Sequence, residues 1–223
     1  MPPPAERPQA RELPETMATP APKPREKPAE APSPASEPAA SPMPDDEKRC
    51  RERLKALGAV FEEAAPISEP EGCAAAHPLT VSKLSAGVAL EPQAVLTCAM
   101  AEASARFVRD HAAPLAKEEF DAPLATVEQA SSYVCRARHG GTKLSEHAFA
   151  NALDWSALTL ADGTRIEVRA HDAEKEPRAF ALISKLHKRA CGPFATVLGP
   201  GSDADHADHF HFDLAKRRNP FCQ

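Results

Sequence analysis

The sequence is poor in aromatic residues and glycine, and it has no long apolar run. Only 11 of the 223 residues are Phe, Trp or Tyr, and 9 are glycine. With a net charge of −5, such a chain offers neither a basic surface for phosphates nor a platform for stacking bases, so nucleic acid is not expected as a partner. No apolar stretch approaches the roughly 18 residues that span a bilayer, and no transmembrane segment is predicted.

The first 44 residues contain no glycine, no aromatic residue and almost no large apolar side chain, but they hold 14 of the 24 prolines. Such a segment cannot bury enough apolar surface to offset its chain entropy. Residues 1–45 are therefore predicted to be a disordered Pro/Ala-rich spacer, which provides reach or binds a proline-recognition groove. The folded domain is predicted over residues 46–223, and we expect it to be a monomer.

The cysteines include no Cys-x-x-Cys pair of the kind that binds zinc through thiolates. Their even number and wide spacing predict three disulfides, and therefore the periplasm or cell envelope. The alternative is a set of six buried thiols in a cytosolic protein. Because the chain begins Met-Pro-Pro-Pro-Ala without a signal peptide, we expect that an export signal has been removed or lies outside this chain. Cys191 and Cys222 are a candidate pair, since the C-terminal tail needs an anchor.

Periodicity predicts several helices and strands after the spacer. They are a helix capped by Asp45 or Asp46 and ended by Gly58, a helix over Gln93–His111, a strand over Ser131–Arg138, a hairpin turning at Asp162-Gly163, a helix over Pro177–Ala190, and a strand over Phe194–Leu198. In the predicted strand over Ser131–Arg138, Arg136 and Arg138 share one face. They are either placed to hold an anion or are solvated surface charges.

The stretch His206–Asp213 alternates polar and apolar residues as a half-buried strand does. His209, His211 and Asp213 are predicted to share one face, with the phenylalanines between them on the other. The two imidazoles would then lie about 7 Å apart, close enough to serve one ion or one reacting group. With 9 histidines in the chain such a pair also arises by chance, so it needs a partner elsewhere.

That partner is predicted in the stretch Ser145–Asp154. His147 and Asp154 are seven residues apart, so they can converge only if the small residues between them turn the chain. Together with His211 they form a set of two histidines and one carboxylate, which suits a catalytic zinc ion with three protein ligands. His209 would then be the catalytic base. His206 is either a second polarising group or a loop histidine.

These residues resemble the zinc signature of the LAS metallopeptidases, the group of lysostaphin, the D-alanyl-D-alanine peptidases and the hedgehog fold. The matching motifs are Ser145-x-His147-x-x-Ala150-x-Ala152-x-Asp154 and His209-x-His211. The sequence is more closely similar to the bacterial extensin-like C-terminal domain family, over about residues 46–223. That similarity runs through Cys135-Arg136, Ser145-Glu146-His147-Ala148, Asn151-Ala152-Leu153-Asp154, Ala190-Cys191, Thr196-Val197-Leu198-Gly199-Pro200 and His209-Phe210-His211-Phe212-Asp213.

The resemblance implies an α+β fold with a small antiparallel sheet flanked by helices, of the hedgehog and D-Ala-D-Ala-peptidase type. It implies that zinc is bound by His147, Asp154 and His211, that His209 is the base or transition-state stabiliser, and that Arg136 faces the substrate. The chain departs from the signature at Ala150, where glycine is usual. If the backbone there has a positive φ, alanine is strained.

Three functions are compatible with these observations. The leading one is a zinc peptidase acting on peptidoglycan stem peptides, as a D,D-endopeptidase or D,D-carboxypeptidase, with zinc activating water and Arg136 holding a carboxylate or the oxyanion. The second is a non-catalytic zinc-containing envelope module that binds the wall or a protein. The third is a disulfide-linked domain without metal. A second histidine on the ligand face, His209, favours the enzyme.

Overall fold

The computed structural model describes residues 43–223, so the predicted spacer lies outside the described residues apart from its last three positions. The described part holds four α-helices: α1 (Asp45–Ala56), α2 (Cys98–Phe107), α3 (Ala113–Phe120) and α4 (Pro177–Ala190). Its strands are β1 (Val60–Glu63), β2 (Ile67–Ser68), β3 (Ala74–Ala75), β4 (Leu79–Ser85), β5 (Val88–Leu96), β6 (Leu124–Ser131), β7 (Ala152–Leu160), β8 (Arg165–Glu167), β9 (Thr196–Leu198), β10 (Phe210–Asp213) and β11 (Phe221–Cys222).

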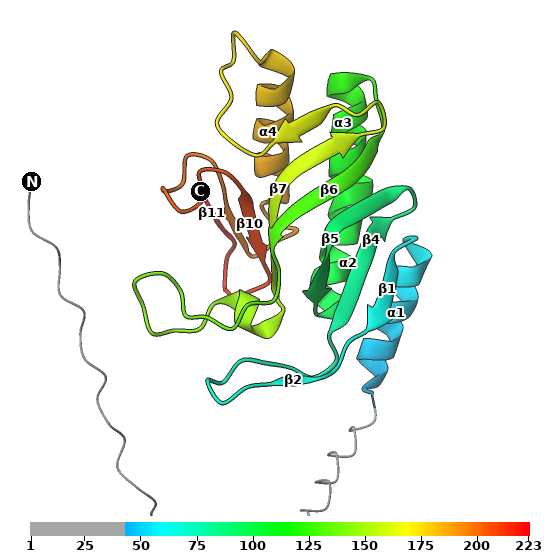
Figure 1. The fold of residues 1–223 in the computed structure, drawn as a ribbon, viewed down its shortest axis with the longest axis vertical. Coiled ribbons are helices and arrows are strands. Elements are labelled where there is room, and N and C mark those ends of the chain that lie inside the picture. The colour runs from blue at the N-terminus through cyan, green and yellow to red at the C-terminus, as the bar shows by residue number, and fades with distance from the viewer. Residues whose placement is uncertain (1–42) are drawn as a thin grey trace, which may run out of the picture. The chain divides into compact units, whose positions relative to one another are not determined.

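One sheet organises residues 43–223, in the strand order β1-β4-β5-β6-β7-β10-β9-β11, with β8 also pairing with β7. Most pairs are antiparallel, whereas β5 with β6 and β9 with β11 are parallel. Helix α2 packs against β4 and β5, and α3 against β6, so both cover the same face (Figure 1). The predicted α+β class, with a sheet flanked by helices, is confirmed. No helix in this part of the chain is long and apolar enough to cross a membrane.

Aromatic side chains fill the core behind the strands that carry the site. The ring of Phe107 lies 5.4–5.7 Å from those of Trp155, Phe194 and Phe212, and Phe194 stacks on Phe212 at 4.5 Å. All four side chains are fully buried. Because each such pair adds about 0.5–1.5 kcal/mol beyond the burial of its area, this cluster fixes β7 and β10 relative to α2.

The helix predicted over Gln93–His111 begins later than expected. Its first residues belong to β5, and α2 starts at Cys98, where the hydroxyl of Thr97 accepts a hydrogen bond from the Met100 N–H at 3.2 Å. At the other end a π-helical turn over Val108–Ala112 joins α2 to α3. The apolar pattern of the residues before Cys98 is compatible with a helix and with a strand. Pairing with the sheet makes them a strand, and the Thr97 cap sets the start of the helix.

The strand predicted over Ser131–Arg138 is also misplaced. Strand β6 ends at Ser131, and the next residues form a loop in which only Ala137 makes a β-bridge, to Leu144. The loop is anchored by the disulfide Cys73–Cys135, not by a strand ladder. The prediction that Arg136 and Arg138 share one face of a strand is therefore wrong.

Helix α4 has the predicted bounds, and the hairpin between β7 and β8 turns at Asp162-Gly163 as predicted. Helix α1 ends before Gly58, but it begins at Asp45 itself with Pro44 in the capping position and no side-chain cap. The acidic first turn of α1 still matches the helix dipole.

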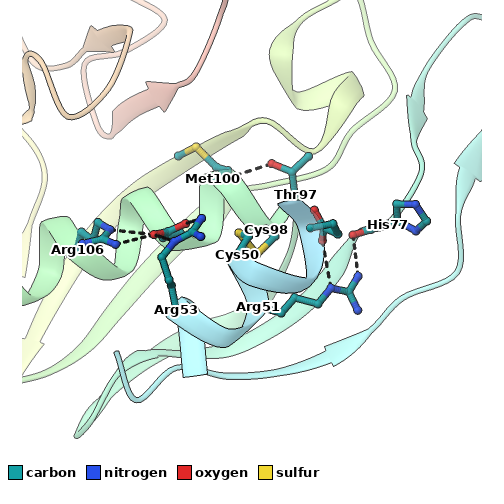
Figure 2. The surroundings of a disulfide bond; sticks show 10 residues. Cys50, Arg51, Arg53, His77, Thr97, Cys98, Met100 and Arg106 are labelled. Carbon is teal, nitrogen blue, oxygen red and sulfur yellow. Dashed lines mark hydrogen bonds and ion pairs between the residues drawn. A yellow bond between two sulfur atoms is a disulfide. The ribbon is translucent and has the colours of Figure 1, made fainter. Parts of the chain in front are cut away.

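All six cysteines pair as predicted, and the suggested pair Cys191–Cys222 is present. The other two disulfides are Cys50–Cys98 and Cys73–Cys135. Figure 2 shows Cys50–Cys98 joining α1 to α2, beside an exposed ion-pair group in which Arg53 and Arg106 both contact Glu102. The disulfide therefore ties the first helix to the helix layer behind the sheet.

Removing the Cys50–Cys98 disulfide is expected to lower the free energy of unfolding by about 2–4 kcal/mol, because a cross-link spanning 48 residues restricts the unfolded chain. The measurement is denaturant unfolding of a Cys50→Ala/Cys98→Ala variant. Replacing exposed Lys83 by Gln serves as a control that should leave the free energy within about 0.5 kcal/mol. An unfolding free energy equal to that of the wild type would contradict the expectation.

Candidate metal centre

Two neighbouring strands bring the predicted ligands together. Asp154 on β7 lies directly opposite His211 on β10 in the antiparallel register. Directly opposed side chains on one face of a sheet stand about 5 Å apart at Cβ, so sheet pairing alone places this carboxylate beside this imidazole. Their neighbours Leu153 and Phe212 point to the other face and are fully buried, as the alternation of the sequence predicts.

His147 reaches the same point because the chain turns just before β7. A short 3₁₀ helix over Glu146–Phe149 ends at Ala150, which has a left-handed backbone with φ of 51°. The turn is closed by the Ala150 N–H donating to the His147 carbonyl at 3.1 Å. Ala150 is the position where glycine is usual in the zinc signature. Its positive φ gives the backbone strain that is expected for an alanine there.

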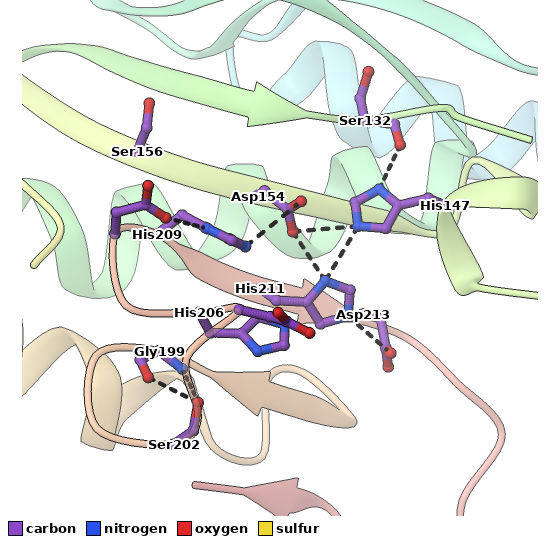
Figure 3. A network of polar contacts seen from close by, with 12 residues as sticks. Ser132, His147, Asp154, Ser156, Gly199, Ser202, His206, His209, His211 and Asp213 are labelled. Carbon is purple, nitrogen blue, oxygen red and sulfur yellow. Dashed lines mark hydrogen bonds and ion pairs between the residues drawn. The ribbon is translucent and has the colours of Figure 1, made fainter. Parts of the chain in front are cut away.

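Three candidate ligand atoms converge in the resulting cluster (Figure 3). His211 Nδ1 lies 2.9 Å from Asp154 Oδ1 and 3.2 Å from His147 Nε2, and His147 Nε2 lies 3.2 Å from Asp154 Oδ1. Ligands 2.0–2.1 Å from one tetrahedral zinc ion stand roughly 3.3–3.4 Å apart. The triangle therefore fits a zinc ion after an expansion of a few tenths of an ångström, with nitrogen and oxygen donors that zinc accepts.

The remaining ring nitrogens fix how both histidines face this point. His147 Nδ1 donates a hydrogen bond to the Ser132 carbonyl, and His211 Nε2 lies 3.2 Å from Asp213 Oδ2. A carbonyl can only accept, so the His147 proton is on Nδ1 and the lone pair of Nε2 faces the cluster. Metal-binding histidines are oriented in this way by a carbonyl or carboxylate behind the ring.

The cluster also attracts positive charge. Burial raises the pKa of Asp154, but the His147 and His211 rings beside the carboxylate outweigh it and hold the pKa well below its usual range. Burial lowers the pKa of His211, yet the Asp154 and Asp213 carboxylates outweigh it and raise the pKa to about 9. Two buried carboxylates, Asp154 and Asp213, thus favour a cation in this cluster, which is either a proton on His211 or a metal ion.

In the metal-free protein this proton should make stability depend on pH. Protonated His211 has a pKa above the value of about 6.5 for an unfolded histidine, so its stabilisation is complete below pH 6.5 and is lost as the pH rises towards 9. The expected result is a melting temperature that falls between pH 7 and pH 9 in chelator-treated protein. A His211→Ala variant should lack that fall, and a flat wild-type profile would contradict the account.

His209 and His206 lie before the strand, since β10 begins at Phe210. The predicted strand over His206–Asp213 is therefore too long, and His209 does not share a strand face with His211. The reason is local: the Asp203 carboxylate accepts from the N–H groups of Asp205 and His206 and holds that segment as a loop. His209 still faces the cluster from the loop, with Nε2 3.9 Å from Asp154 Oδ2 and Nδ1 2.9 Å from Asp208 Oδ1.

A cleft of about 570 Å³ opens onto the cluster, and Arg136, Arg138, His206 and His209 line it with Asp154 and His211. The ring of His206 lies 5.8 Å from that of His211 and 5.2 Å from that of His209, and its Nδ1 contacts Asp203 at 2.7 Å. The structure thus brings all six predicted site residues to one place: His147, Asp154, His211, His209, His206 and Arg136.

Sequence reasoning did not assign a role to Asp213, His139 or Arg217. Asp213 supports His211 from behind, His139 pairs with Asp205 on the rim, and Arg217 lines the cleft. Asp213 could have been found, because it follows His211 by two residues and so lies on the same strand face. His139 and Arg217 carry no such spacing signal, since the loops that bear them are positioned by tertiary contacts.

Replacing Asp213 with asparagine is expected to weaken zinc binding by about 10–100-fold, because His211 would lose the carboxylate that orients its ring. The measurement is a zinc titration against a competing chelator. Asp208→Asn is the matched control, since the Asp208 side chain is 88 % exposed and contacts His209 and not a ligand. Equal affinities for the two variants would show that Asp213 has no part in holding the metal.

The fold and this cluster define a disulfide-linked α+β domain with a buried two-histidine, one-carboxylate centre at the base of a cleft. Residues 48–223 match the family model described as extensin-like protein C-terminus, and the chain belongs to that family. No curated protein and no solved structure matches the chain significantly.

Proposed function

We propose that this domain is a zinc-dependent peptidase that acts on peptidoglycan stem peptides in the cell envelope, as a D,D-endopeptidase or D,D-carboxypeptidase. The observation that carries the proposal is the convergence of His147, Asp154 and His211 at the base of an open cleft. Three protein ligands with access from one side are typical of catalytic zinc, whereas structural zinc has four. The resemblance of these motifs to the LAS metallopeptidases supports the same assignment.

Bound zinc would polarise the scissile carbonyl and lower the pKa of its water to about 7. His209 is the proposed base: with Nδ1 held by Asp208, its Nε2 faces the cleft and can take a proton from the attacking water. The same nitrogen then returns the proton to the leaving amine. Asp208 holds the ring in place, in the way that carboxylates orient catalytic histidines.

Arg136 is proposed to hold a substrate carboxylate or the oxyanion. It is exposed at the cleft and makes no ion pair with another described residue, so its guanidinium is available to an anion. His206 is proposed as a second donor to the oxyanion, because its ring lies beside those of His209 and His211. The disulfides support an envelope location, since they persist in oxidising compartments.

A second candidate function is a non-catalytic zinc module that binds the wall or a protein partner. The deep burial of His147 and Asp154, 0 % and 4 % exposed, is what favours it, since structural sites are closed. Against it stands His209, which faces the cluster without belonging to the ligand set.

A digest of purified peptidoglycan tests the proposal. The full chain loaded with zinc is expected to release new peptide ends detectable by mass spectrometry. A chelator should abolish their release and added zinc should restore it. Unchanged peptidoglycan with zinc bound would favour the non-catalytic module, and digestion that persists after complete removal of metal would contradict both candidates.

A further inference from the structure

A second groove, of about 500 Å³, adjoins the cleft and shares Arg138, Glu146 and Arg217 with it. We call it the basic groove, because its lining includes four cationic side chains and one carboxylate: Arg138, Lys143, Lys216, Arg217 and Glu146. The whole chain has a net charge of −5, so this excess of positive charge is a local feature. A groove of this size and charge suits an anionic group of a ligand.

Most of this positive charge is not neutralised within the domain. The Arg138 guanidinium lies 3.7 Å from Glu146, whose other oxygen accepts from the Asn151 amide at 2.8 Å. Among residues 43–223, the side chains of Lys143 and Lys216 are exposed and contact no carboxylate. One acidic residue thus faces four cationic side chains, and a bound anion would neutralise part of the excess positive charge.

The groove begins directly beside the metal centre. Glu146 precedes the ligand His147 in the chain. On the other side, Arg217 Nε donates to the Thr196 hydroxyl at 2.9 Å, and Thr196 pairs in register with Asp213, the carboxylate behind His211. A peptide lying across the cleft can therefore continue into the groove without a break.

We propose that the basic groove is a specificity subsite for the carboxylates of the peptide substrate, away from the bond that is cut. The inference rests on the proposed peptidase function and names the chemistry of the substrate beyond the scissile bond. Arginine pairs with carboxylates through two parallel hydrogen bonds, and lysine adds a point charge at longer reach. Because the lysines are exposed, they act on capture and on salt dependence more than on the chemical step.

The test uses the full chain with Lys143→Gln and Lys216→Gln together, neither of which is placed in the catalytic machinery. The matched control is Lys83→Gln with Lys188→Gln, which removes the same charge from exposed sites outside the cleft and the groove. Each protein receives a synthetic stem peptide with free carboxylates and the same peptide with those carboxylates amidated. KM and kcat are measured on zinc-loaded protein, and Kd is measured by calorimetry in the His209→Ala background.

The groove variant is expected to raise KM and Kd for the carboxylate peptide by roughly 5–30-fold, with kcat unchanged and a weaker dependence on salt. The amidated peptide should bind all proteins alike, and the control should match the wild type. Equal binding of the two peptides by the wild type, or equal loss in groove and control variants, would overturn the inference. The inference would also be overturned if inorganic phosphate displaced the carboxylate peptide at a concentration below the Kd of that peptide.

The two proposals fail in different ways. If no peptide is cleaved but the Kd values separate as expected, the peptidase function is wrong and the carboxylate subsite stands. If cleavage is observed but amidation changes neither KM nor Kd, the subsite is wrong and the peptidase function stands.

Discussion

Replacing His211 with alanine is expected to abolish tight zinc binding and peptidase activity together. His211 Nδ1 is the candidate ligand atom closest to the Asp154 carboxylate, and the His211 ring is anchored from behind by Asp213. Without it the site keeps two ligands, and the loss of affinity should exceed the roughly 10–100-fold that follows from losing an outer partner of a ligand. The buried Asp154 would also lose a hydrogen-bond partner, so metal-free stability should fall.

Zinc content after dialysis and peptide release from peptidoglycan are the two measurements for this variant. His111→Ala is the control, because His111 lies on the helical segment between α2 and α3 and does not line the cleft. Circular dichroism should show that the His211→Ala variant is folded. A folded variant that holds zinc as tightly as the wild type would remove His211 from the ligand set.

Replacing His209 with alanine should separate zinc binding from activity. Zinc should stay bound while turnover falls by about 10²- to 10⁴-fold, the usual contribution of a positioned general base. The reason is geometric. His209 Nε2 is 3.9 Å from Asp154 Oδ2 and lies outside the converging group, so its removal leaves His147, Asp154 and His211 in place. The measurement is kcat on a stem peptide together with zinc content.

Two outcomes would contradict this assignment. Loss of zinc in His209→Ala would make His209 a fourth ligand, and His206 would then be the first candidate for the base, because its ring lies 5.2 Å from that of His209. Full activity in His209→Ala would make its position beside the cluster a matter of packing. His206→Ala, measured in parallel, separates these cases.

The convergence of the three predicted ligands could be foreseen because it depends on local patterns. Alternation placed His211 opposite the phenylalanine face, and the small residues between His147 and Asp154 allowed the chain to turn, which it does at Ala150. The residues of helix α4 and the pairing of Cys191 with Cys222 follow from similarly local signals.

Other boundaries depend on contacts that the sequence does not display. Residues 94–96 have an apolar pattern compatible with a helix, but they pair with β4 as part of β5. The loop that carries Arg136 is held by the disulfide between Cys135 and Cys73, and Cys73 lies 62 positions before Cys135 in the chain. His209 faces the site from a loop that Asp203 shapes through backbone hydrogen bonds. In each case the boundary depends on a residue that is distant in the chain, or on a turn that is too irregular for periodicity to predict.

X-ray absorption at the zinc edge, on the full chain loaded with one equivalent of zinc, identifies the atoms that bind the metal. We expect a shell of nitrogen and oxygen atoms at about 2.0–2.1 Å with the scattering of two imidazoles and no sulfur, because all six cysteines are in disulfides. In a His147→Ala/His211→Ala variant this signature should be absent. A sulfur shell at about 2.3 Å, or an identical spectrum from the variant, would show that zinc binds elsewhere and would contradict the account.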